Sequence, residues 1–108
     1  MPASPFHAIA DPTRRQILDL LRQRGPQRAG DLAGRFPRIS RPAVSKHLRV
    51  LRGSRLVQQK QRGREIWYQL NPLPLGQVQG WLETYRGLLA GTHEAAKGFG
   101  RKRLSYRK

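Results

Sequence analysis

The chain has 108 residues, no cysteine and a strongly basic composition, with 22 Lys and Arg, six Asp and Glu, and a formal net charge of +16. Its length predicts one domain, and the lack of cysteine excludes disulfides and thiolate metal sites. No apolar run approaches the roughly 20 residues that cross a bilayer, and the first residues lack the pattern of a secretory signal. We therefore expect a cytoplasmic protein with no membrane contact, whose charge favours a polyanionic partner.

The positive charge is concentrated in the middle and at the end of the chain. Residues 35–64 contain ten basic and no acidic residues. Residues 97–108 contain six further basic residues and little apolar content, which predicts a mobile tail. The expected organisation is a folded domain over residues 1–96 followed by a basic tail over residues 97–108.

Four helices are expected in the first half of the chain. Two of them begin where a capping residue precedes a proline, at Ser4-Pro5 and at Asp11-Pro12. Ser40 is expected to cap the fourth helix in the same way. The expected helices cover about residues 5–9, 12–24, 28–36 and 41–53.

After the fourth helix the apolar period changes from 3.6 to 2, which predicts a β-hairpin. Its strands are expected at residues 56–61 and 65–70, with a turn at Arg62-Gly63. A last helix runs from about Leu75 to Leu89. The fold class is therefore mainly α with a small β-hairpin, in the order helix, helix, helix, helix, strand, strand, helix. This is the order of a winged helix-turn-helix protein, in which the second helix of the pair enters the major groove of DNA.

The fourth helix has two different faces. Val44, Leu48 and Leu51 fall on one side and are expected to pack on the domain. The opposite side carries small, polar and basic residues, which suit base edges and phosphates, while arginines at the hairpin tip suit a narrow minor groove. The alternatives are an ordinary solvated face and a tip that is charged for solubility. The candidate DNA-binding residues from this face and the hairpin tip are Pro42, Ser45, Lys46, Arg49, Arg62 and Arg64.

The last helix has an apolar stripe that exceeds what one small subunit can cover. Such a patch marks an interface, and a two-fold homodimer buries it most simply. Trp81 and Tyr85 could instead line an effector pocket, although aromatic residues on a stripe favour core or interface. The candidate interface residues on this stripe are Val78, Trp81, Leu82, Tyr85, Leu88 and Leu89.

Catalysis and metal binding have little support in the sequence. The chain lacks a cysteine nucleophile, its six acidic residues are scattered, and its histidines, at positions 7, 47 and 93, fall in different elements. We expect no enzyme activity, no cofactor and no metal site.

Three segments together resemble the ArsR family of bacterial repressors. They are residues 6–15 (FHAIADPTRR), 39–48 (ISRPAVSKHL) and 63–70 (GREIWYQL). The resemblance implies a winged-helix homodimer bound to double-stranded DNA at a palindromic operator. The first and last helices of such a dimer form the interface, which adds Phe6 and Ile9 to the candidate interface residues. It also implies that Ser40, Arg41, Pro42, Ser45 and Lys46 read the operator.

The sequence departs from the metal chemistry of that family. Residues 29–33 (AGDLA) contain none of the cysteines of the thiolate sensors, and the last helix offers only His93 and Glu94, side by side. We expect a metal-independent repressor that responds to a small organic effector or represses its own promoter. The alternatives are a structural nucleic-acid-binding protein of the nucleoid or ribosome and an interaction module that has lost DNA binding.

Overall fold

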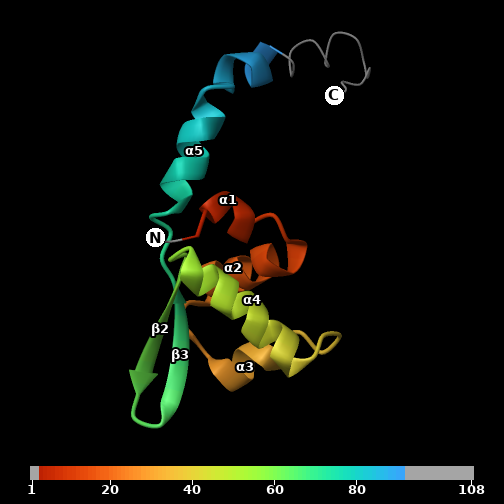
Figure 1. Cartoon of the computed structure of the whole chain (residues 1–108), viewed down its shortest axis with the longest axis vertical. Coiled ribbons are helices and arrows are strands. Elements are labelled where there is room, and N and C mark those ends of the chain that lie inside the picture. Colours follow the sequence, from red (N-terminus) through yellow and green to blue (C-terminus); the bar gives the residue numbers. More distant parts are fainter. Residues whose placement is uncertain (1–2, 92–108) are drawn as a thin grey trace. The chain divides into compact units, whose positions relative to one another are not determined.

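The computed structural model describes residues 3–91, in two units that divide between Val78 and Gln79. Figure 1 shows the elements along the chain. The first unit contains α1 (Pro5–Ala8), α2 (Pro12–Arg24), β1 (Gln27–Arg28), α3 (Ala29–Gly34), α4 (Arg41–Gly53), β2 (Val57–Arg62) and β3 (Glu65–Leu70). The last helix, α5 (Leu75–Glu83), begins in the first unit and continues in the second, where residues 86–91 are also helical.

The predicted fold class is confirmed, since four helices, a hairpin and a last helix follow one another in the expected order. The proposed tail over residues 97–108 and the end of the proposed domain lie outside the described residues. Within residues 3–91, no helix has the length and apolar content needed to span a bilayer.

The three expected helix caps are present. The side chain of Ser4 accepts a hydrogen bond from the Phe6 N–H at 3.1 Å, and Asp11 accepts one from the Arg14 N–H at 3.0 Å. Ser40 accepts one from the Ala43 N–H at 3.2 Å. Each cap satisfies an amide that lacks a partner inside its helix, so α2 and α4 begin where the sequence predicts.

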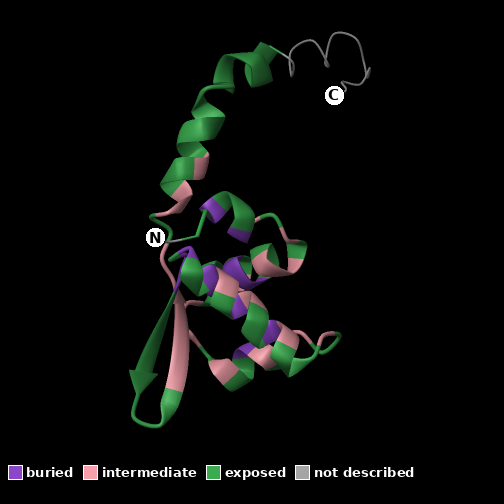
Figure 2. Ribbon diagram, in the orientation of Figure 1, coloured by how far each residue is buried: buried purple, intermediate pink, exposed green. Residues whose placement is uncertain are grey.

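The hydrophobic core lies among the helices and the base of the hairpin (Figure 2). It combines the apolar side of α4 with residues from α1, α2 and α3 and with the first residues of the hairpin. Its buried members are Ala8, Ile17, Leu18, Leu21, Leu32, Val44, Leu48, Leu51, Leu56 and Val57. The core thus fixes which side of α4 faces outward.

The sheet contains one strand more than the sequence predicts. β1 pairs with β3 through Gln27↔Tyr68 and Arg28↔Trp67, which gives the antiparallel order β1-β3-β2. A strand of two residues is too short to show an apolar period, so only the three-dimensional pairing reveals it. This pairing supports a hairpin that would be marginal alone.

The hairpin turn lies one residue later than predicted. Arg62 pairs with Glu65 as part of the ladder, so Gly63 and Arg64 form the turn, and β2 starts at Val57 instead of Leu56. Gly63 has φ +62°, a value common in two-residue hairpin turns that glycine adopts without strain. The shift places Arg64, and not Arg62, at the tip.

Two helices also differ from their expected ranges. α3 covers six residues and not nine, because the amides of Arg35 and Phe36 bond three residues back, to Leu32 and Ala33, and tighten the last turn before Pro37. α5 is interrupted at Thr84, whose amide and hydroxyl both donate to the Trp81 carbonyl. A threonine hydroxyl that bonds to a nearby carbonyl competes with the regular helix ladder.

Candidate nucleic-acid interface

Helix α4 presents a set of polar and basic side chains opposite the core. Val44, Leu48 and Leu51 are buried on one side of the helix, as the sequence predicts. All candidate residues on the other side are exposed. We call this side the α4 basic face; its members are Arg41, Pro42, Ser45, Lys46 and Arg49, with the capping residue Ser40 at its start.

The cations of the α4 basic face have no carboxylate partner within residues 3–91. The described acidic side chains pair elsewhere: Asp11 with His47, Asp19 with Arg22, Asp31 and Glu65 with Arg28, and Glu83 with Arg86. Uncompensated cations on one face raise the local concentration of polyanions and steer them to that face. The positive charge of the α4 basic face is therefore available to a polyanionic partner, as the composition predicts.

The β2–β3 hairpin is a second exposed basic element. In Figure 1 it projects from the helices of the first unit, and Figure 2 shows that β2 and the turn are exposed along most of their length. Arg64, in the turn, makes no hydrogen bond, ion pair or ring contact with residues 3–91. This position leaves its guanidinium available to a phosphate or a groove.

Arg62, in contrast, is held by an aromatic ring. Its guanidinium carbon lies 4.8 Å from the centre of the Trp67 ring, within the range of a cation–π contact. The hairpin register pairs Arg62 with Glu65 and Lys60 with Trp67, so the two stacked side chains are diagonal neighbours. The structure thus separates two arginines that the sequence places in one group.

A network of charges joins the turn end of β3 to β1 and α3. The guanidinium of Arg28 donates to Glu65 and to Asp31, each at 2.9 Å, and the indole N–H of Trp67 donates to Glu65 at 3.2 Å. The bond from Arg28 lowers the pKa of Glu65, so this carboxylate stays ionised and paired. No local sequence pattern indicates this network, because Arg28 and Glu65 are 37 residues apart.

Arg14 joins α1, α2 and α4. Its guanidinium donates to the carbonyls of Ala8 at 2.8 Å and His7 at 3.1 Å, and Nη1 lies 3.3 Å from Nδ1 of His47. His47 thus lies between Arg14 and Asp11, the carboxylate of which is 3.9 Å from its Nδ1. Within residues 3–91 no group of three His, Cys, Asp or Glu side chains could hold a metal ion; His93 and Glu94 lie outside that range.

Replacing Asp11 by Ala is expected to lower the free energy of unfolding by about 1 kcal/mol at pH 7, because α2 loses its cap. The hydrogen bond from the Arg14 amide lowers the pKa of Asp11, with a smaller contribution from His47. The ionised carboxylate therefore stabilises the fold above about pH 4, and this contribution disappears as the pH falls through the lower pKa of the folded state. Urea denaturation at pH 7 and pH 3 measures the free energy of unfolding of parent and variant. The difference between the two proteins should be smaller at pH 3 than at pH 7. An equal difference at both values would show that the ionised carboxylate of Asp11 does not stabilise the fold.

The second unit presents an apolar patch. Its five members, Trp81, Leu82, Tyr85, Leu88 and Leu89, line one hollow of about 370 Å³ and are each exposed by 42 to 68%. The rings of Trp81 and Tyr85 meet edge to face, with their centres 5.2 Å apart. Of the other candidate interface residues, all in the first unit, Phe6 is exposed, and Ile9 and Val78 are half-buried.

Comparisons with known proteins agree with this geometry. Residues 11–59, which include α2, α3 and α4, match the family described as bacterial regulatory protein, arsR family. The transcriptional repressor SdpR of Bacillus subtilis is 43% identical over 77 residues, which cover 71% of this chain and 83% of SdpR. An HTH-type transcriptional regulator of Mycobacterium tuberculosis is 42% identical over 84 residues, covering 78% of this chain and 77% of the relative.

A solved structure of an ArsR-like transcriptional regulator from Rhodococcus sp. RHA1 superposes with a TM-score of 0.64 at 35% identity, covering 91% of each chain. The fold is thus that of winged-helix transcriptional regulators. The chain belongs to the ArsR family, and it is a DNA-binding regulator of transcription and not an enzyme.

Proposed function

We propose that the protein represses transcription as a homodimer bound to an inverted-repeat operator. The α4 basic face carries the proposal, because its side chains are exposed together and meet no carboxylate of the described chain. A helix of this kind enters the major groove, where Ser, Lys and Arg bond to base edges and phosphates. Ser40, Arg41, Pro42, Ser45, Lys46 and Arg49 would contact the operator from α4, and Arg62 and Arg64 from the hairpin.

We assign dimerisation to the apolar patch of the second unit, together with Phe6, Ile9 and Val78. A contiguous exposed apolar surface is typical of an interface, and a two-fold axis buries the same residues of both copies. The two α4 helices would then enter successive major grooves, about 34–36 Å apart. An operator read in this way has two-fold symmetry.

The described residues offer no site through which a metal would regulate the protein. Residues 29–33 supply no thiolate or imidazole, and the described residues hold no cluster of three potential metal ligands. We infer a metal-independent regulator without a resident cofactor, which responds to an organic effector or represses its own promoter. Its DNA target implies a location in the cytoplasm.

Arg64→Ala is expected to lower operator affinity and to reduce the slope of log affinity against log salt by about one. The reason is that a hairpin arginine without a partner in the protein would neutralise one phosphate. Fluorescence anisotropy over a series of salt concentrations measures this slope. Arg24→Ala, which removes an exposed cation from α2, is the matched control and should leave the slope unchanged. An unchanged slope for Arg64→Ala would remove the hairpin tip from the interface.

Selection of genomic fragments by the purified chain tests the proposed function. The enriched fragments should share an inverted repeat, and two chains should bind one duplex. The affinity for the repeat should exceed that for a scrambled duplex by roughly 10³-fold at physiological salt. Equal affinity for both would indicate a structural nucleic-acid-binding protein, and no binding to either would indicate an interaction module.

A further inference from the structure

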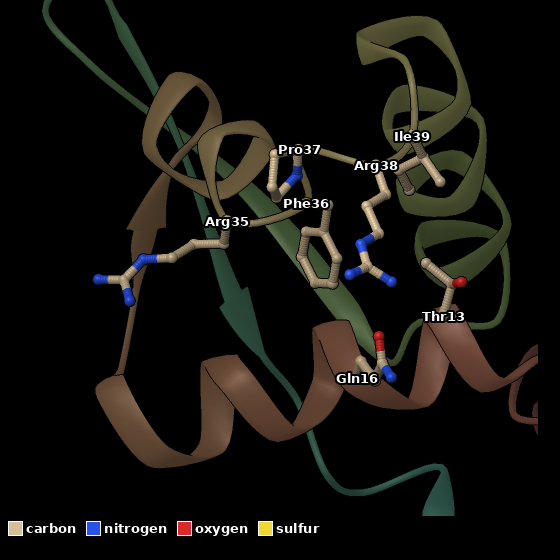
Figure 3. A pocket seen from close by; sticks show the side chains of 7 residues that line it. All are labelled: Thr13, Gln16, Arg35, Phe36, Pro37, Arg38 and Ile39. Carbon is tan, nitrogen blue, oxygen red and sulfur yellow. The ribbon is translucent and has the colours of Figure 1, made fainter.

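A hollow of about 300 Å³ lies between α2 and the segment that joins α3 to α4. We call it the turn pocket. Its volume is at the lower end of the range for small-molecule sites. Figure 3 shows the lining residues, which are Thr13, Gln16, Arg35, Phe36, Pro37, Arg38 and Ile39.

The lining of the turn pocket combines an apolar wall with polar side chains. Phe36 and Ile39 are half-buried and pack against the core, and Pro37 lies between them in the chain. Thr13 and Gln16, on α2, contribute a hydroxyl and an amide. Apolar surface with a few polar groups is the usual composition of a site for a small organic molecule.

Arg38 gives the turn pocket its charge. In Figure 3 its side chain turns back toward Thr13 and Gln16 beside the ring of Phe36, whereas the Arg35 side chain points away. Arg38 makes no hydrogen bond or ion pair with residues 3–91, and no acidic residue lines the pocket. A guanidinium without a counter-ion beside an apolar wall suits a carboxylate, which it can bind through two parallel hydrogen bonds.

We propose that the turn pocket binds a small organic carboxylate with an apolar body and that it is the effector site of the regulator. The effector role rests on the proposed function. The residues after Arg38 lead directly to Ser40 and the start of α4, so an occupant contacts the segment that sets the beginning of the DNA-binding helix. Occupation also neutralises a cation close to that helix, which should lower operator affinity.

Benzoate is a suitable probe of the turn pocket, with benzamide as its uncharged analogue. In ¹H–¹⁵N spectra of the full chain, benzoate should shift the amides of Thr13, Gln16 and residues 36–39 saturably, and benzamide should not. Inorganic phosphate tests whether the anion alone suffices, and the proposal expects it to bind at least tenfold more weakly than benzoate. Absence of a saturable benzoate shift, or equal binding of phosphate, would overturn the proposal.

Two arginine variants separate a carboxylate site from a DNA contact. Arg38→Gln should weaken benzoate binding by about tenfold or more. The matched control is Arg24→Gln, which removes an exposed cation of α2 that does not line the turn pocket; it should bind benzoate like the parent. If Arg38 served instead as a phosphate contact, Arg38→Gln would reduce the salt slope of operator binding by about one with benzoate binding unaltered. That result would overturn the assignment.

Operator titrations with and without saturating benzoate test the effector role. The expected result is a fall in affinity of about fivefold or more for the parent and none for Arg38→Gln. Benzoate binding with unchanged operator affinity would overturn the effector role. The titrations without benzoate test the proposed function separately: an absence of specific operator binding there would count against the repressor function and not against the turn pocket.

Discussion

Leu88→Asp is expected to convert the proposed homodimer into monomers and to lower operator affinity by about 10²-fold or more. Leu88 is exposed by 68% and belongs to the apolar patch of the second unit. In the proposed dimer an aspartate at this position would be a buried charge without a partner, which is strongly unfavourable. The loss of affinity follows because each half of the operator would then be bound separately, without the gain from two linked contacts.

Light scattering measures the mass of Leu88→Asp, and anisotropy its affinity for the operator. Leu73→Asp is the matched control, since Leu73 is exposed by 81% and lies outside the apolar patch. This control should stay dimeric and retain its affinity. A dimeric Leu88→Asp would show that the interface lies elsewhere on the chain.

Lys46→Ala is expected to weaken operator binding by about tenfold to a hundredfold while the dimer persists. Lys46 lies on the α4 basic face, opposite the buried Val44, Leu48 and Leu51. Alanine has the highest helix propensity of the amino acids, so the change should not weaken α4 itself. The loss should therefore reflect a missing contact with DNA.

Ser45→Ala, on the same face, is also expected to weaken operator binding, but by a smaller factor than Lys46→Ala. The reason is that a neutral hydroxyl forms a weaker hydrogen bond than a cation does. Arg24→Ala again controls for the general loss of one positive charge. Operator affinities equal to the parent for both α4 variants would exclude this face from the interface.

The sequence was most informative where structure depends on neighbouring residues. Helix caps at Ser4, Asp11 and Ser40 act over two or three residues, and the buried side of α4 follows from helical spacing. These local rules gave the helix starts, the two faces of α4 and the returning strand β3. They also gave six of the eight candidate DNA-binding residues, the other two, Ser40 and Arg41, being implied by the family resemblance; all eight are exposed.

Features that depend on distant contacts could not be read from the sequence. The strand β1 exists because Gln27 and Arg28 pair with β3, and the Arg28–Glu65 bond follows from that pairing. The one-residue shift of the turn depended on the ladder register, which puts Arg62 over Trp67. The turn pocket likewise needs α2 and the α3–α4 segment to be side by side, and no local pattern marks it.

Amide hydrogen exchange of the full chain, with and without its operator, would locate the surface that binds DNA. Protection should appear in the first turns of α4, over residues 41–49, and at the hairpin tip around Gly63 and Arg64. The amides of exposed residues in α2 should exchange at the same rate with and without the operator. Specific operator binding with protection confined to regions outside α4 and the hairpin would show that another surface binds DNA.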